Sequence, residues 1–154
     1  MKKLLVAVSL PVLMAACASN SDNLMADAQV SADMLQHHNW QLTQVDGKDV
    51  VSEEKVEAPR LEIGEKMTAN GNAGCNNFFG QGELNEEGQF RIEKMGMTMK
   101  MCMGDVMTTE QVMSSTLSTW SDITLTKENL ILKGQEHELK IGRASCRERV
   151  LRLV

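Results

Sequence analysis

Hydrophobic and polar positions alternate along much of the chain between residues 35 and 141, which predicts β-strands. Trp40 and Leu42 alternate with polar neighbours, and Leu61 and Ile63 repeat the same period of two. Further strands are expected at Phe78–Leu84, Phe90–Met95, Ile123–Thr126, Leu130–Leu132 and His137–Ile141. Because the strands are short and the turns between them tight, the sequence predicts a mainly β fold built as an antiparallel meander.

One α-helix is predicted to interrupt the strands, over residues 109–120. Thr108 lies three residues before Gln111, which is the spacing of a capping box, and Glu110 in the first turn suits the helix dipole. Three apolar side chains then recur on one helical face: Met113, Leu117 and Trp120. We expect this helix to cover one face or end of the sheet.

The first seventeen residues have the layout of an export signal. Two lysines precede an apolar run, Leu4–Met14, which is too short to span a bilayer, and small residues lead to Cys17. The cleavage region resembles a bacterial lipobox, although Met14 stands where leucine is usual. We therefore predict a signal peptide over residues 1–16, lipidation of Cys17, and a flexible tether over residues 17–33.

Ala18, which is not an aspartate, favours sorting to the outer membrane by resemblance to enterobacterial lipoproteins. The expected localisation is thus the cell envelope, as an outer-membrane lipoprotein that faces the periplasm. Its expected membrane contact is the N-terminal lipid. An ordinary signal peptide with an incidental Cys17 is the alternative.

The net charge of the whole chain is less negative than that of its middle part, because both ends are basic. The formal net charge is −5, but Lys2 and Lys3 contribute +2 and residues 142–154 contribute +3, which leaves −10 for residues 17–141. Such a domain repels nucleic acid, so no nucleic-acid partner is expected. The string Ile141–Val150 resembles one frame of a translated sequencing adapter. We therefore expect the domain to cover residues 34–141 and residues 142–154 to be a non-native tail.

Two separated segments carry a resemblance to the META domain family. The first is the glycine-rich Gly71–Gly82, where we expect the glycines to form close turns and Asn76 and Asn77 to bond to nearby backbone. The second is the methionine-rich Met95–Met107. The residues that match the family motif are Gly74, Cys75, Asn76, Phe78, Gly80, Thr98, Cys102 and Glu110.

The resemblance covers roughly residues 35–140, and Leu35–His38 and Gly64–Met67 look like a heat-shock lipoprotein of this family. It implies a compact, barrel-like antiparallel fold with one helix and no catalytic reaction. It also implies an association with heat-shock induction and with tolerance of the antibiotic novobiocin. In an oxidising compartment we expect Cys75 and Cys102 to form a disulfide, with two buried free thiols as the alternative.

Two other functions compete with an envelope-stress role. Five alternating methionines would share one strand face and suit Cu(I): Met95, Met97, Met99, Met101 and Met103. We favour the interpretation that they fill an aromatic-poor core, and no metal site is predicted. The second alternative is a barrel that inhibits a protease or other hydrolase through an exposed loop at Asn70–Gly74.

An enzyme is the least favoured class. The chain has three histidines, and it lacks a Ser-His-Asp spacing, a metalloprotease helix motif and a nucleophile elbow. We expect no cofactor. The ligand or protein partner is left open by the sequence.

Overall fold

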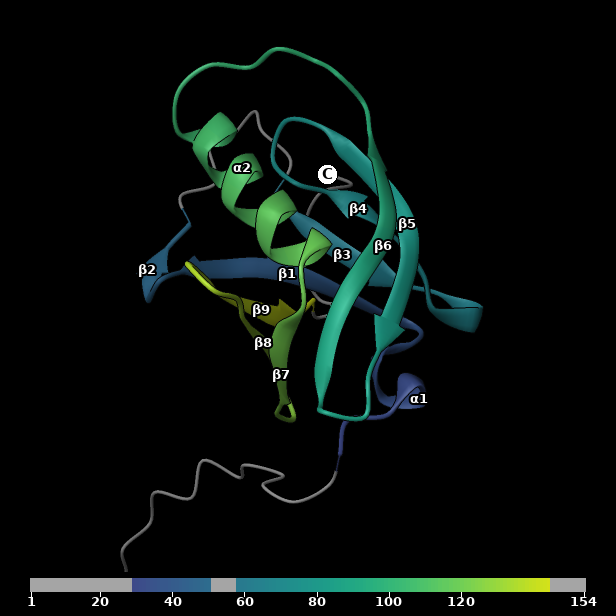
Figure 1. The fold of residues 1–154 in the computed structure, drawn as a ribbon. Coiled ribbons are helices and arrows are strands. Elements are labelled where there is room, and N and C mark those ends of the chain that lie inside the picture. The colour runs from purple at the N-terminus through teal and green to yellow at the C-terminus, as the bar shows by residue number, and fades with distance from the viewer. Residues whose placement is uncertain (1–28, 51–57, 145–154) are drawn as a thin grey trace, which may run out of the picture.

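Eight antiparallel strands close into a barrel in the computed structural model, which describes residues 29–50 and 58–144 (Figure 1). The strand order is β1-β3-β4-β5-β6-β7-β8-β9, and β9 pairs with β1 to close the ring, while the short β2 pairs with β1. The strands are β1 (His38–Val45), β2 (Lys48–Asp49), β3 (Arg60–Ile63), β4 (Thr68–Asn72), β5 (Asn77–Leu84), β6 (Gln89–Met97), β7 (Ser121–Leu125), β8 (Asn129–Lys133) and β9 (Glu138–Arg143). The predicted mainly β, barrel-like fold with one main helix is confirmed.

The predicted alternation defines the inside of the barrel. In β7 and β8 every second residue is buried, and Trp40, Phe78 and Phe90 are each at most 2% exposed in the core. The Trp40 indole donates a hydrogen bond to the carbonyl of Leu35, at the end of the short helix α1 (Ala32–Leu35). Tight turns join the strands as expected, and Gly47 and Gly88 take positive φ angles in two of them.

The main helix, α2 (Asp105–Ser118), begins four residues before the predicted start. The capping-box prediction is wrong, because Gly104 precedes the helix with a φ of 76° and no side chain caps its first turn. A positive φ suits glycine, so the chain turns into the helix there and not at Thr108. Met113 and Leu117 are buried as predicted, but Trp120 follows the helix and is only half-buried.

The strand β4 and the short 3-10 turn η1 (Glu65–Met67) were not predicted. Gly71 lies within β4, where an added Cβ would come within 2.0 Å of the Arg60 carbonyl oxygen and 2.6 Å of the Phe78 ring. This glycine therefore lets neighbouring strands approach closely and does not form a turn. Gly80 is similar, since its Cβ would lie 2.5 Å from Ile92.

The folded part extends past both expected domain boundaries. Val30 and Ala32, in the segment predicted as tether, pack against the core because both are apolar. The last strand was expected to end at Ile141, but β9 continues through Arg143, because Gly142 and Arg143 pair with β1. The predicted signal peptide, Cys17 and residues 145–154 lie outside the described residues. Within residues 29–50 and 58–144, no helix is long and apolar enough to cross a membrane.

The helix α2 packs against β6, next to the short contact between β6 and β7 (Figure 1). The strands β6 and β7 pair at only two positions, Gln89 with Asp122 and Phe90 with Ser121. Beyond Phe90, β6 still pairs with β5, but its other edge lies beside α2, and a shallow groove of about 520 Å³ runs between β6 and α2. The predicted role of the helix as a cover on the sheet is therefore confirmed.

Candidate functional site

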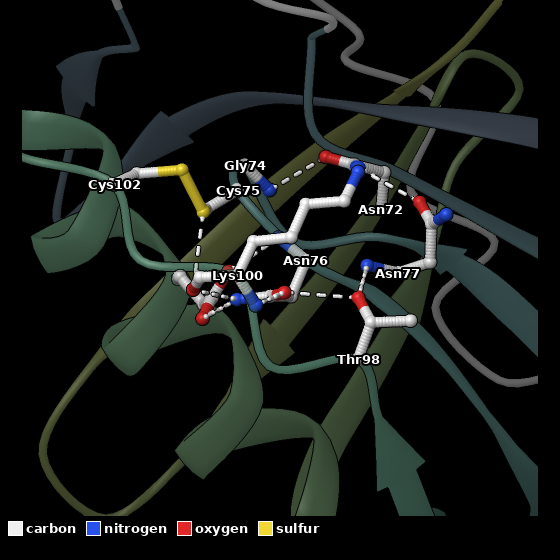
Figure 2. Close-up of a disulfide and its surroundings, with 9 residues drawn as sticks. Asn72, Gly74, Cys75, Asn76, Asn77, Thr98, Lys100 and Cys102 are labelled. Atoms are coloured by element: carbon white, nitrogen blue, oxygen red, sulfur yellow. Dashed lines mark hydrogen bonds between the residues drawn. A yellow bond between two sulfur atoms is a disulfide. The ribbon is translucent and has the colours of Figure 1, made fainter.

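All of the family-motif residues except Phe78 and Gly80 gather where the turn between β4 and β5 meets the start of α2 (Figure 2). The turn is held by its own polar groups: the Asn72 side chain accepts a hydrogen bond from the Gly74 N–H at 2.7 Å, and the Ala73 N–H donates to the Asn76 carbonyl at 2.9 Å. Gly74 has a φ of 127°, which strains any residue with a side chain. An added Cβ there would also lie 3.1 Å from the carbonyl oxygen of Val106 in α2.

The Asn76 side chain is the hub of this cluster and is 3% exposed. Its Oδ1 accepts hydrogen bonds from the Thr98 hydroxyl at 2.9 Å and from the Lys100 N–H at 2.6 Å. Its Nδ2 donates to the Lys100 carbonyl at 3.0 Å and to Glu110 at 2.9 Å. The prediction that Asn76 bonds to nearby backbone is wrong, because its partners lie 22 to 34 residues away.

Glu110 holds the helix against the turn. Its carboxylate is buried and accepts hydrogen bonds from the Asn76 backbone N–H at 2.6 Å and from the Asn76 side chain. Because α2 begins at Asp105, Glu110 lies in the second turn and not in the first, so its expected dipole role is replaced by this contact. Hydrogen bonds to a charged carboxylate are among the stronger ones in proteins.

The disulfide expected between Cys75 and Cys102 is present in the structure (Figure 2). Its Cα atoms are 6.0 Å apart, and it joins the β4–β5 turn to the segment that leads into α2. Five motif residues thus form one cross-brace, which holds three chain segments together: Cys75, Asn76, Thr98, Cys102 and Glu110. Phe78 lies in the core.

Sequence reasoning missed two contributors to this cluster. Asn72 caps the turn, and its Nδ2 donates to the Asn77 side chain at 2.9 Å. Asparagine side chains often bond to the backbone two residues further on, so this residue type was a signal that could have identified it. Lys100 contributes only its backbone N–H and C=O, and nothing in the sequence marks those groups.

The five alternating methionines do not share one strand face. β6 ends at Met97, and Met95 and Met97 pack partly against the core. Met99, Met101 and Met103 lie in the connection to α2 and are 98%, 94% and 90% exposed. The interpretation that all five fill the core is therefore wrong for these three.

The expectation that Asn70–Gly74 forms an exposed loop, as hydrolase inhibition would require, is also wrong. Within Asn70–Gly74 only Asn70 is exposed, while Asn72 is 6% and Ala73 0% exposed. The segment forms the end of β4 and the turn that follows it, so it is not an exposed loop.

A second polar contact joins the turn after β1 to the start of β9 at one end of the barrel. The Asp46 carboxylate accepts a hydrogen bond from the Glu138 N–H at 2.8 Å and lies 2.8 Å from the His137 ring. These bonds to Glu138 and His137 hold the pKa of Asp46 below its ordinary value. The pair lies on the surface, and no group of three or more His, Cys, Asp or Glu residues in the described part of the chain could hold a metal ion.

Known proteins share both the sequence and the fold. A model of the META domain matches residues 33–145. Heat shock protein HslJ of Escherichia coli (strain K12) is 34% identical over 133 residues, which span 86% of this chain and 89% of that protein. A protein structure solved by NMR superposes with a TM-score of 0.64 at 31% identity and covers 73% of this chain and 94% of its own. An NMR structure from Burkholderia xenovorans, with a TM-score of 0.60 at 18% identity over 74% of this chain and 86% of its own, shows the fold alone.

Proposed function

This chain belongs to the META domain family, and from that membership we propose that it is a non-enzymatic lipoprotein of the cell envelope that protects the cell during heat or antibiotic stress. The observation that carries the proposal is the similarity to a heat shock protein over 86% of the chain. The lipobox-like sequence at Cys17 supports attachment to the outer membrane by an N-terminal lipid.

The disulfide supports export from the cytoplasm. Disulfides persist in the periplasm, whereas cytoplasmic thiols are kept reduced. The bond between Cys75 and Cys102 lies inside the family motif, so an oxidising compartment is needed for the motif to be fully braced. Membership of the META domain family is therefore consistent with a location in the periplasm.

The use of the motif residues supports a structural role for them. The side chains of Asn76, Thr98 and Glu110 make hydrogen bonds to one another and to backbone groups of the same cluster that are distant in sequence. Among the described residues, every buried side-chain nitrogen and oxygen has a hydrogen-bond partner. A cluster whose polar groups are satisfied in this way stabilises the fold.

The proposal is tested by deleting the gene in its native bacterium and measuring growth with novobiocin and at elevated temperature. We expect the deletion to increase sensitivity, the wild-type gene to restore tolerance, and Cys17→Ala to fail because the protein loses its anchor. Ser19→Ala, two residues further on, is the matched control and should restore tolerance. A deletion strain with unchanged sensitivity would contradict the stress role, and full rescue by Cys17→Ala would contradict the anchor.

A further inference from the structure

The connection between β6 and α2 alternates between residues that are bound to the rest of the protein and residues that are exposed to solvent. We call residues 98–104 the methionine loop; it arches from the end of β6 to the start of α2 (Figure 1). Every second residue is bound to the protein: the Thr98 hydroxyl and the Lys100 backbone bond to Asn76, and Cys102 is in the disulfide. The residues between them, Met99, Met101 and Met103, are 90% exposed or more.

Packing does not explain these three side chains. Side chains with 90 to 98% of their surface in water make almost no contact with neighbours, so they are not part of the core. Two other methionines behave as core residues, since Met113 is fully buried and Met67 is 8% exposed. The methionine loop instead presents three thioether sulfurs to solvent from an anchored backbone.

From this arrangement we propose that the methionine loop binds one Cu(I) ion through the sulfur atoms of Met99, Met101 and Met103. Thioether sulfur is a soft, uncharged ligand that favours Cu(I) over Zn²⁺, Ca²⁺ or Mg²⁺. Each pair of neighbouring ligands is separated by one residue, roughly 6–7 Å along an extended chain. A methionine side chain is unbranched, long and flexible, so the three sulfurs can turn toward one ion.

The surroundings favour a site made only of thioethers. Cys75 and Cys102 are joined to each other, so neither supplies a thiolate beside the loop. The bonds to Asn76 and the disulfide fix the backbone before any ion arrives, which lowers the entropy lost on binding. The proposal depends on the loop alone and stands or falls separately from the stress role.

The test is an anaerobic titration of the purified, disulfide-intact protein with Cu(I) against a competing Cu(I) chelator, with ascorbate keeping the copper reduced. We expect one Cu(I) per chain with a dissociation constant below micromolar. The triple variant Met99→Leu/Met101→Leu/Met103→Leu keeps side-chain size and removes the sulfurs, so its affinity should fall at least about tenfold, equivalent to about 1.4 kcal/mol. The matched control, Met95→Leu/Met97→Leu, should bind as the wild type does.

A second measurement locates the ion. Ag(I), a stable stand-in for Cu(I), should shift the NMR signals of the methyl groups of Met99, Met101 and Met103 and leave that of Met113 in place. An equal urea midpoint for the triple variant and the wild type shows that the fold is intact. The proposal is overturned if the wild type binds no Cu(I) below micromolar, if the triple variant binds as tightly, or if the shifts fall on other methionines.

Discussion

At the scale of single residues, the buried Asn76 side chain joins the segments of the motif through its hydrogen bonds to Thr98, Lys100 and Glu110. Gly74, Asn76, Thr98 and Glu110 were named from the family pattern, and the structure brings them together. Their roles depend on partners up to 34 residues away, which only the closed fold brings into contact. Local rules for asparagine describe neighbouring backbone, so they assigned Asn76 the wrong partners.

Asn76→Ala should destabilise the fold strongly. It removes the partner of the Lys100 N–H and of the Thr98 hydroxyl, and it leaves one oxygen of the buried Glu110 carboxylate without its donor. We expect a loss of about 2–4 kcal/mol in the free energy of unfolding, measured by urea denaturation. Asn70→Ala, at an exposed position on β4, is the control and should change it by less than about 0.5 kcal/mol. Equal small effects for both variants would show that the hub is dispensable.

Asp46 should contribute stability that depends on pH. Its pKa in the folded protein is lowered by the bonds to Glu138 and His137, so the contribution is present above its unfolded pKa and is lost as the pH falls through the folded value. Asp46→Asn should therefore lower the urea midpoint at pH 7, and the difference from the wild type should vanish in strong acid.

The matched control for this titration is Asp33→Asn, at an exposed position of α1. It should follow the wild-type dependence of the urea midpoint between pH 7 and pH 2. If Asp46→Asn also follows the wild-type curve over that range, the carboxylate contributes nothing through these bonds.

At the scale of elements, strands in which hydrophobic and polar residues alternate were predicted well. The strand β4 and the start of α2, where glycines determine the backbone, were not. The alternation in β7 and β8 is visible in the sequence because one face is core and the other is solvent. In β4 the inward positions are small residues, such as Ala69 and Gly71, which carry too little hydrophobic signal. The space they leave is filled by the Phe78 ring of the next strand.

The start of α2 gives a prediction that tests whether Thr108 lies inside the helix or caps it. Thr108 is exposed in the interior of the helix and caps nothing, so Thr108→Ala should raise the free energy of unfolding by a few tenths of a kcal/mol through better helix propensity. A capping threonine would instead cost about 1 kcal/mol when replaced by alanine. Urea denaturation distinguishes the two, and a loss near the second value would restore the capping box.

The disulfide should stabilise the connection between elements. It closes a loop of 27 residues, and the chain-entropy model assigns such a loop roughly 3–4 kcal/mol. The double variant Cys75→Ala/Cys102→Ala should lose about that amount of unfolding free energy in urea. Adding a reductant should lower the wild-type midpoint and leave the double variant unchanged. A reductant effect of equal size on both proteins would argue against this bond.

At the scale of the whole molecule, the meander was predictable and its closure was not. Apart from β6 and β7, which α2 separates, neighbouring strands from β3 to β9 are joined by short connections, and these imply the pairing. The closing pair brings Leu42 beside Ile141, nearly the full length of the domain apart, and no local pattern specifies it. The family resemblance supplied that part of the prediction.

The proposed export of this META barrel and its attachment by a lipid on Cys17 are tested by mass spectrometry of the mature protein extracted from membranes. We expect an N-terminal peptide that begins at Cys17 with acyl chains attached, together with a crosslinked peptide pair containing Cys75 and Cys102. Recovery of a soluble chain that retains residues 1–16, with both cysteines as free thiols, would contradict this proposal.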